Sequence, residues 1–105
     1  MEKFIDLVSW VKTGACSSCN SYIYTIPVAV DADIETHLAP IGPLTYDLSK
    51  YKIVKLETDF ILISSRLTTN KITVKFKSKA DETKGIFDTH LARYISAKLG
   101  QEIEV

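Results

Sequence analysis

Residues 71–77 read Lys71-Ile72-Thr73-Val74-Lys75-Phe76-Lys77, a strict alternation of polar and apolar side chains. Successive side chains of a β-strand point to opposite faces of its sheet, so this alternation predicts a half-buried strand. One face of the strand buries Ile72, Val74 and Phe76, while the lysines lie on the other face of the sheet. The segment therefore predicts a sheet that covers a core with one face and carries positive charge on the other.

The flanking segments predict further strands and a long helix. Tyr51 to Leu67 reads as extended, and Glu57-Thr58-Asp59 within it marks either a bulge or a tight turn that splits the run into two strands. Downstream, a helix begins at a cap, Asp81 or Thr83, and Gly100 ends it. Its apolar stripe consists of Phe87, Leu91, Tyr94, Ile95 and Leu99. Residues 102–105 fit a short final strand.

The first half of the chain predicts two more helices and one strand. Residues 1–14 form a helix in this interpretation, because Phe4, Leu7, Val8 and Val11 recur at three- and four-residue steps. Residues 15–21 form a loop that contains both cysteines. Tyr22 to Val30 is rich in β-branched and aromatic residues and predicts a strand, which Pro27 places at a sheet edge or bulges.

A short helix follows this strand. Asp31 is the expected N-cap, Ile34 and Leu38 face inward at a four-residue spacing, and Pro40-Ile41-Gly42-Pro43 ends the helix. The complete order is a helix followed by β-α-β-β-α-β over residues 22–105. This order resembles the ferredoxin-like βαββαβ sandwich with an extra N-terminal helix and a mainly antiparallel sheet. We expect residues 1–105 to form one α+β domain, a fold class that hosts many functions and fixes none of them.

The composition is that of an ordinary globular domain, and its charges are unevenly distributed along the chain. The 105 residues include 46% hydrophobic residues, 13 basic ones and 13 acidic ones, which gives a net charge of zero. Residues 50–79 nevertheless carry eight basic and two acidic residues, a net charge of +6, so the remainder of the chain carries −6. Membrane-spanning and signal-peptide patterns are absent from the sequence. We expect no membrane association, and two cysteines without a secretory context favour the cytoplasm, or the virion if the protein is viral.

The two cysteines form a Cys16-Ser17-Ser18-Cys19 motif, which is half of a zinc signature. Four ligands are needed, and His37 with His90, or the same cysteines of a second subunit, would complete the set. A redox role is weaker, because nothing basic adjoins the thiols to lower their pKa. The leading interpretation is two structural cysteines, two packed histidines and no cofactor. The sequence contains no recognisable catalytic set, which predicts that the protein is not an enzyme.

Two sets of surface residues are candidates for partner binding. Lys71, Lys75, Lys77 and Arg66 would contact phosphate groups or an acidic partner. RNA-binding domains of the ferredoxin-like fold stack bases on aromatic residues of their central strands, whereas Phe76 is assigned to the core here. A lysine-rich strand also protects an exposed sheet edge from aggregation. The second set is aromatic and would lie at a protein interface: Trp10, Tyr46 and Tyr51.

The leading functional hypothesis is a small, non-enzymatic interaction or assembly subunit of a larger complex, either cellular or viral. Its partner would be another protein or a second copy, with the basic strand of one subunit against the acidic helix of the next. The alternatives are a nucleic-acid-binding module that uses residues 71–79 and a zinc-stabilised dimer through Cys16 and Cys19.

Overall fold

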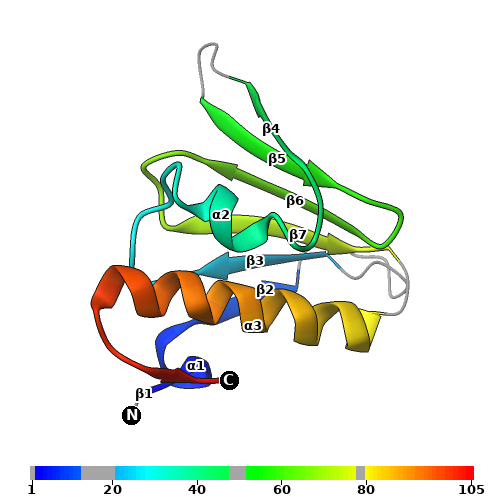
Figure 1. Cartoon of the computed structure of the whole chain (residues 1–105). Helices are drawn as coiled ribbons and strands as arrows, with labels where there is room; N and C mark the ends of the chain where they lie inside the picture. Colours follow the sequence, from blue (N-terminus) through cyan, green and yellow to red (C-terminus); the bar gives the residue numbers. More distant parts are fainter. Residues whose placement is uncertain (1, 13–20, 48–51, 78–79) are drawn as a thin grey trace.

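A six-stranded sheet lies at the centre of the molecule, and α2 and α3 both lie on one of its faces (Figure 1). This computed structural model describes residues 2–12, 21–47, 52–77 and 80–105. Its elements, in chain order, are β1 (Glu2–Lys3), α1 (Phe4–Leu7), β2 (Ser9–Lys12), β3 (Ser21–Thr25), α2 (Ile34–Leu38), β4 (Leu44–Asp47), β5 (Ile53–Glu57), β6 (Ile61–Arg66), β7 (Lys71–Phe76), α3 (Ala80–Leu99) and β8 (Ile103–Glu104). The predicted α+β class with a mostly antiparallel sheet is confirmed.

The strand order of the main sheet is β2-β3-β7-β6-β5-β4, and every neighbouring pair is antiparallel. The short strands β1 and β8 form a separate parallel pair that brings the two ends of the chain together (Figure 1). The ferredoxin-like topology is not confirmed, because the strand order differs. The predicted order lacked β2 and β4, and its final strand pairs with β1 outside the main sheet.

The alternating strand predicted over residues 71–77 is β7, which lies inside the sheet between β3 and β6. Ile72 and Val74 are fully buried and Phe76 is nearly so, whereas Lys71, Thr73 and Lys75 are exposed. Burying three large apolar side chains contributes about 1.5–3 kcal/mol each. This prediction is confirmed residue by residue.

Helix α3 supplies most of the opposing layer of the core. Phe87, Leu91, Tyr94 and Ile95 of the predicted stripe are fully buried, and Gly100 ends the helix with a φ of +68°. Leu99 is instead 39% exposed, because a final helical residue has packing neighbours on one side only. The helix begins at Ala80, so neither Asp81 nor Thr83 is the cap that the sequence indicated. Within the described parts of the chain, neither α3 nor any shorter helix is long and apolar enough to span a membrane.

Two polar networks attach α3 to the rest of the molecule. The Tyr24 hydroxyl of β3 donates to the nearly buried Asp88 carboxylate over 2.9 Å, and the Lys84 ammonium lies 2.6 Å from the same carboxylate. Further along α3, the Tyr94 hydroxyl donates to the Ala29 carbonyl and accepts from the Asp31 amide. Buried polar groups are costly unless paired, so these bonds favour one orientation of the helix on the sheet.

The predicted N-terminal helix over residues 1–14 is wrong. Within the described residues 2–12, the helix is limited to Phe4–Leu7, and Ser9–Lys12 is a strand that pairs with β3. Phe4 and Val8 are buried as the spacing indicated, but Val11 is 67% exposed because it lies on the outer side of β2. In residues 9–12, hydrogen bonding to β3 determines the conformation, although the spacing of apolar residues also fits a helix.

The strand predicted from Tyr22 to Val30 ends at Thr25, before Pro27. It is neither at an edge nor bulged at the proline, because β3 lies between β2 and β7. The short acidic helix is confirmed as α2, with Ile34 and Leu38 buried. Its N-cap residue is Asp33 rather than Asp31, although the Asp31 carboxylate accepts a hydrogen bond from the Asp33 amide over 2.9 Å.

Residues 57–59 form a tight turn and not a bulge, so the extended run predicted over this part of the chain is two strands, β5 and β6. The Thr58 hydroxyl accepts hydrogen bonds from the Phe60 and Ile61 amides over 3.1 and 3.2 Å, and this turn joins β5 to β6. Gly42 approaches the same turn closely, because a Cβ atom placed on it would lie 2.7 Å from Cγ2 of Thr58. Thr58 cannot rotate away without losing both hydrogen bonds.

We therefore predict that Gly42→Ala lowers the free energy of unfolding by about 1–3 kcal/mol through overpacking. The matched control is Gly85→Ala in α3, where an added Cβ has no atom within 4 Å and should stabilise the helix by up to about 1 kcal/mol. Urea unfolding followed by circular dichroism measures both values. Equal effects of the two substitutions would contradict the described packing at Gly42.

Candidate interaction surface on the open face of the sheet

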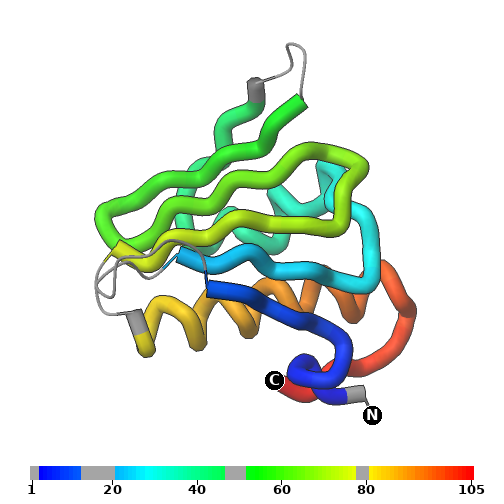
Figure 2. The backbone as a smooth tube through the Cα atoms, turned by 180° about the vertical axis from the view of Figure 1, so that it is seen from behind, coloured from blue at the N-terminus to red at the C-terminus, as the bar shows by residue number. Residues whose placement is uncertain are grey.

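The main sheet has one face that no described helix covers, as the view from behind shows (Figure 2). We call this the open face. The strand register defines its members, because Thr73 lies opposite Ile23 on one side and Ser64 on the other, and Ser64 lies opposite Lys55. Its described side chains are Ser9, Val11, Ser21, Ile23, Thr25, Thr45, Ile53, Lys55, Glu57, Leu62, Ser64, Arg66, Lys71, Thr73 and Lys75.

The open face carries a net positive charge. Lys55, Lys71 and Lys75 are exposed and form no ion pair with any described residue. Glu57 is the one acid among the described side chains of this face, and the Lys77 ammonium lies 2.6 Å from its carboxylate. The hydrogen bond that Lys77 donates to this carboxylate holds the pKa of Glu57 below its usual value. Glu57 therefore stays ionised and paired with Lys77.

The structure brings all four predicted cationic contact residues to this side of the sheet. Lys71 and Lys75 lie on β7, Lys77 follows directly after it, and Arg66 lies at the end of β6. Lys55 was not among the predicted contact residues, although the β5–β6 pairing places it on the same face. The alternation of apolar and polar residues in Ile53-Val54-Lys55-Leu56-Glu57 indicates that Lys55 is exposed. The alternation places Lys55 on the open face only once residues 57–59 are known to form a tight turn.

Between the cations the open face is made of hydroxyl groups and aliphatic side chains. A shallow depression of about 440 Å³ lies between β4, β5 and β6, lined by Thr45, Tyr46, Ile53, Lys55, Leu62 and Ser64. Ammonium and hydroxyl groups donate hydrogen bonds to carboxylate or phosphate oxygens. Ile53 and Leu62 add apolar contact area, so the chemistry suits an anionic surface that also carries apolar groups.

Aromatic side chains of the main sheet lie on the opposite face, against the helices. The Tyr22 and Phe76 rings are 5.8 Å apart, and the Tyr24 ring packs edge-on against Phe87 at 5.1 Å. The expectation that Phe76 belongs to the core is confirmed.

Tyr46 borders the depression between β4, β5 and β6, but the strand register places it opposite the buried Val54 and its hydroxyl bonds to Glu35 of α2. Among the described side chains that the register places on the open face, none is an aromatic ring on which a base could stack.

The predicted aromatic interface residues are positioned elsewhere. Trp10 is half-buried, stacks on Tyr24 at 5.8 Å and lies beneath the Lys84 ammonium. Tyr46 is half-buried and donates to the Glu35 carboxylate over 2.5 Å, which raises the pKa of the Tyr46 hydroxyl to about 12. Tyr51 lies outside the described residues. A role for these residues at an interface stays a prediction.

The predicted metal ligands are only partly described. Cys16 and Cys19 lie outside the described residues, whereas His37 is on α2 and His90 is on α3. Burial, reinforced by the charges of Arg93 and His37, holds the pKa of His90 below its usual value. No group of three or more histidine, cysteine, aspartate or glutamate side chains suited to a metal ion occurs in the described part of the chain. Zinc binding stays a prediction.

The lowered pKa of His90 predicts a loss of stability in mild acid. As the pH falls below about 6.5, the unfolded chain takes up a proton that the folded chain resists. The free energy of unfolding should therefore fall between neutral pH and the folded-state pKa, and level off below it. Urea unfolding at several pH values should show that His90→Gln removes this part of the slope. An unchanged slope in the variant would contradict the assignment.

Comparison with known proteins gives no relative from which a function could be carried over. The chain matches no protein-family model, no curated protein and no solved structure at a significant level.

Proposed function

We propose that the protein is a non-enzymatic interaction module that binds an acidic protein surface on the open face of its sheet. One observation carries the proposal: Lys55, Lys71 and Lys75 project from an uncovered sheet face without an ion pair to any described residue. Charge of one sign concentrated on one face steers oppositely charged partners and fixes their orientation.

The size and composition of the open face suit a protein partner. Six strands spaced about 4.8 Å apart give a surface roughly 24 Å wide, comparable to a small protein interface. Val11, Ile23 and Leu62 supply apolar contacts among the cations and hydroxyls. Ion pairs at the rim of an interface add specificity, whereas apolar contacts supply most of the affinity.

Nucleic acid is a weaker candidate for the same face. Phosphate groups would satisfy the lysines, but single-stranded nucleic acid is normally held by bases stacked on aromatic rings as well. Tyr22, Tyr24 and Phe76, which have the strand positions for that role, lie on the covered face. An acidic protein uses both the cations and the aliphatic side chains of the open face.

The proposal involves no catalysis. His37 and His90 lie on the helices, on the opposite side of the sheet from the open face. None of the described hydroxyl groups of the open face therefore has a histidine beside it to act as a general base.

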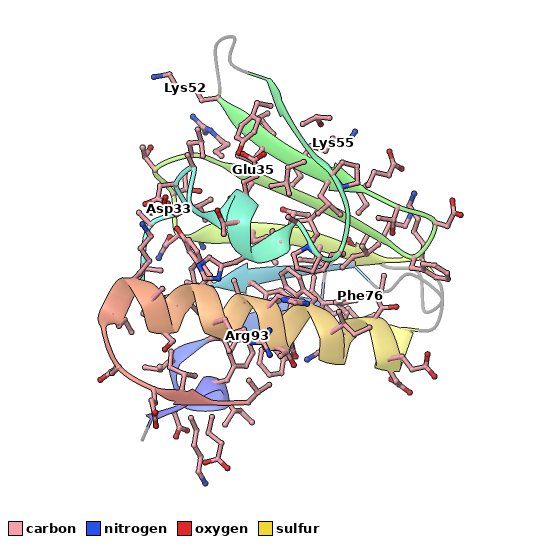
Figure 3. The ribbon with its side chains drawn as sticks, viewed as in Figure 1. Asp33, Glu35, Lys52, Lys55, Phe76 and Arg93 are labelled. Carbon is pink, nitrogen blue, oxygen red and sulfur yellow. The ribbon has the colours of Figure 1, made fainter. Side chains whose placement is uncertain are left out.

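We predict that poly-L-glutamate binds this face and that Lys71→Glu with Lys75→Glu weakens binding at least tenfold at low salt. The matched control is Lys3→Glu with Arg93→Glu, which changes the net charge by the same amount. These two residues lie on β1 and α3, outside the open face (Figure 3). Amide chemical shifts in NMR titrations report both affinity and location. The expected shifts lie in β5, β6 and β7.

Two results would overturn the proposal. Equal weakening in both double variants would show that only net charge matters, rather than the open face. Tighter binding of a single-stranded oligonucleotide than of poly-L-glutamate, at equal numbers of charges, would identify nucleic acid as the partner. Binding in each case should weaken with added salt, because screening shortens the reach of the lysine charges.

A further inference from the structure

The face of the molecule opposite the open face is acidic. Residues 31–38 and 80–104, which contain α2, α3 and β8, carry eight acidic and three basic residues, a net charge of −5. Asp33 and Glu35 lie at α2, and Arg93 is one of the three bases (Figure 3). We call this surface the helical face. The two faces of the domain therefore carry opposite charge.

Internal ion pairs neutralise only part of the helical face. Lys84 pairs with the nearly buried Asp88, and the single ammonium of Lys98 lies 2.6 Å from both the Asp31 and the Asp33 carboxylates. Asp81 and Glu82 are exposed in the first turn of α3 and form no ion pair with any described residue. Asp81 and Glu82 are therefore available to pair with lysines of the opposite charge, such as Lys71 and Lys75 of the open face.

The helical face also offers apolar contact of the kind that the open face presents. Ile86 projects from α3 with 53% of its surface exposed, next to a hollow lined by Glu82, Gly85, Thr89, His90 and Arg93. Val11 is 67% exposed on the open face. Helices commonly lie on one face of an antiparallel sheet, and the described helices of this chain likewise leave the open face accessible to a second copy (Figure 2).

We propose that the acidic partner is the helical face of a second copy, so that chains assemble head to tail. This inference rests on the proposed function of the open face and names its occupant. The helices of one copy would cover the sheet of the next and bring Asp81 and Glu82 towards Lys71 and Lys75. Stacking in this order gives alternating helix and sheet layers.

Head-to-tail stacking joins two different faces, so it does not produce a two-fold symmetric dimer. A contact between two different faces leaves one face of each kind free at the ends, so it continues into an open filament or closes into a ring. A two-fold dimer through the open faces would instead place lysines against lysines, and like charges across an interface are unfavourable. The charge distribution therefore favours larger assemblies over a closed dimer.

The first test is the mass in solution at two ionic strengths. At about 0.01 M salt, where charges act over about 30 Å, light scattering should show a mass that rises with concentration above 11.8 kDa. At about 1 M salt, where the range is about 3 Å, the mass should return to that of the monomer. A monomer at low salt and high concentration would overturn the inference.

A mixing experiment tests the head-to-tail contact itself. One variant, Lys71→Gln with Lys75→Gln, lacks the basic contact, and the other, Asp81→Asn with Glu82→Gln, lacks the acidic one. Each variant alone should be monomeric, and an equimolar mixture should give a 1:1 dimer and nothing larger, because only one intact contact can form. Circular dichroism checks that each variant is folded, since removing acids from the first turn of a helix weakens that helix slightly.

The outcomes separate this inference from the proposed function. Assembly of either variant on its own, or no dimer in the mixture, would overturn head-to-tail stacking. If poly-L-glutamate binds the open face while the wild-type chain stays monomeric, the proposed function stands and the partner is a different acidic protein. If neither binding nor assembly occurs, both proposals fail.

Discussion

The antiparallel pairing of β7 with β3 and β6 is the constraint on which the rest of the structure depends. Tyr22 lies opposite Val74 in one pair, and Ile63 lies opposite Val74 in the other, so three strands share one buried face. A shift of one residue in either pair would turn the apolar side chains outward and the lysines into the core. The same register that builds the core therefore gathers Lys71 and Lys75 on the face without helices.

Two polar networks hold α3 on one face of the main sheet. Asp88 ties the first half of α3 to Tyr24, and Tyr94 ties the second half to the segment before α2. Each tyrosine is fully buried and has its hydroxyl paired, so moving the helix away from this face would leave buried polar groups without partners. These bonds therefore hold α3 on this face of the sheet.

The sequence predicts those parts of the fold in which local pattern and tertiary environment agree. Ile72, Val74 and Phe76 alternate as a half-buried strand must, and Phe87 and Leu91 recur as a buried helix face must. Val11 was wrongly predicted to lie on a helix, because a few apolar residues at helical spacing also fit a short helix followed by a strand. The pairing of β8 with β1 joins opposite ends of the chain, and no local signal carries it. Lys55 joined the candidate surface only through the register of β5 with β6.

The central claim is that one face of the sheet, which no described helix covers, is positively charged. It is tested most directly by NMR relaxation of methyl groups, on the monomer at low concentration, with an anionic and a cationic paramagnetic probe. The account predicts that the anionic probe relaxes the methyl groups of Ile23, Ile53 and Leu62 more strongly than the cationic one does, whereas the buried Ile72 and Val74 are relaxed far less by either probe. Equal relaxation by the two probes, or protection of all five residues, would contradict it.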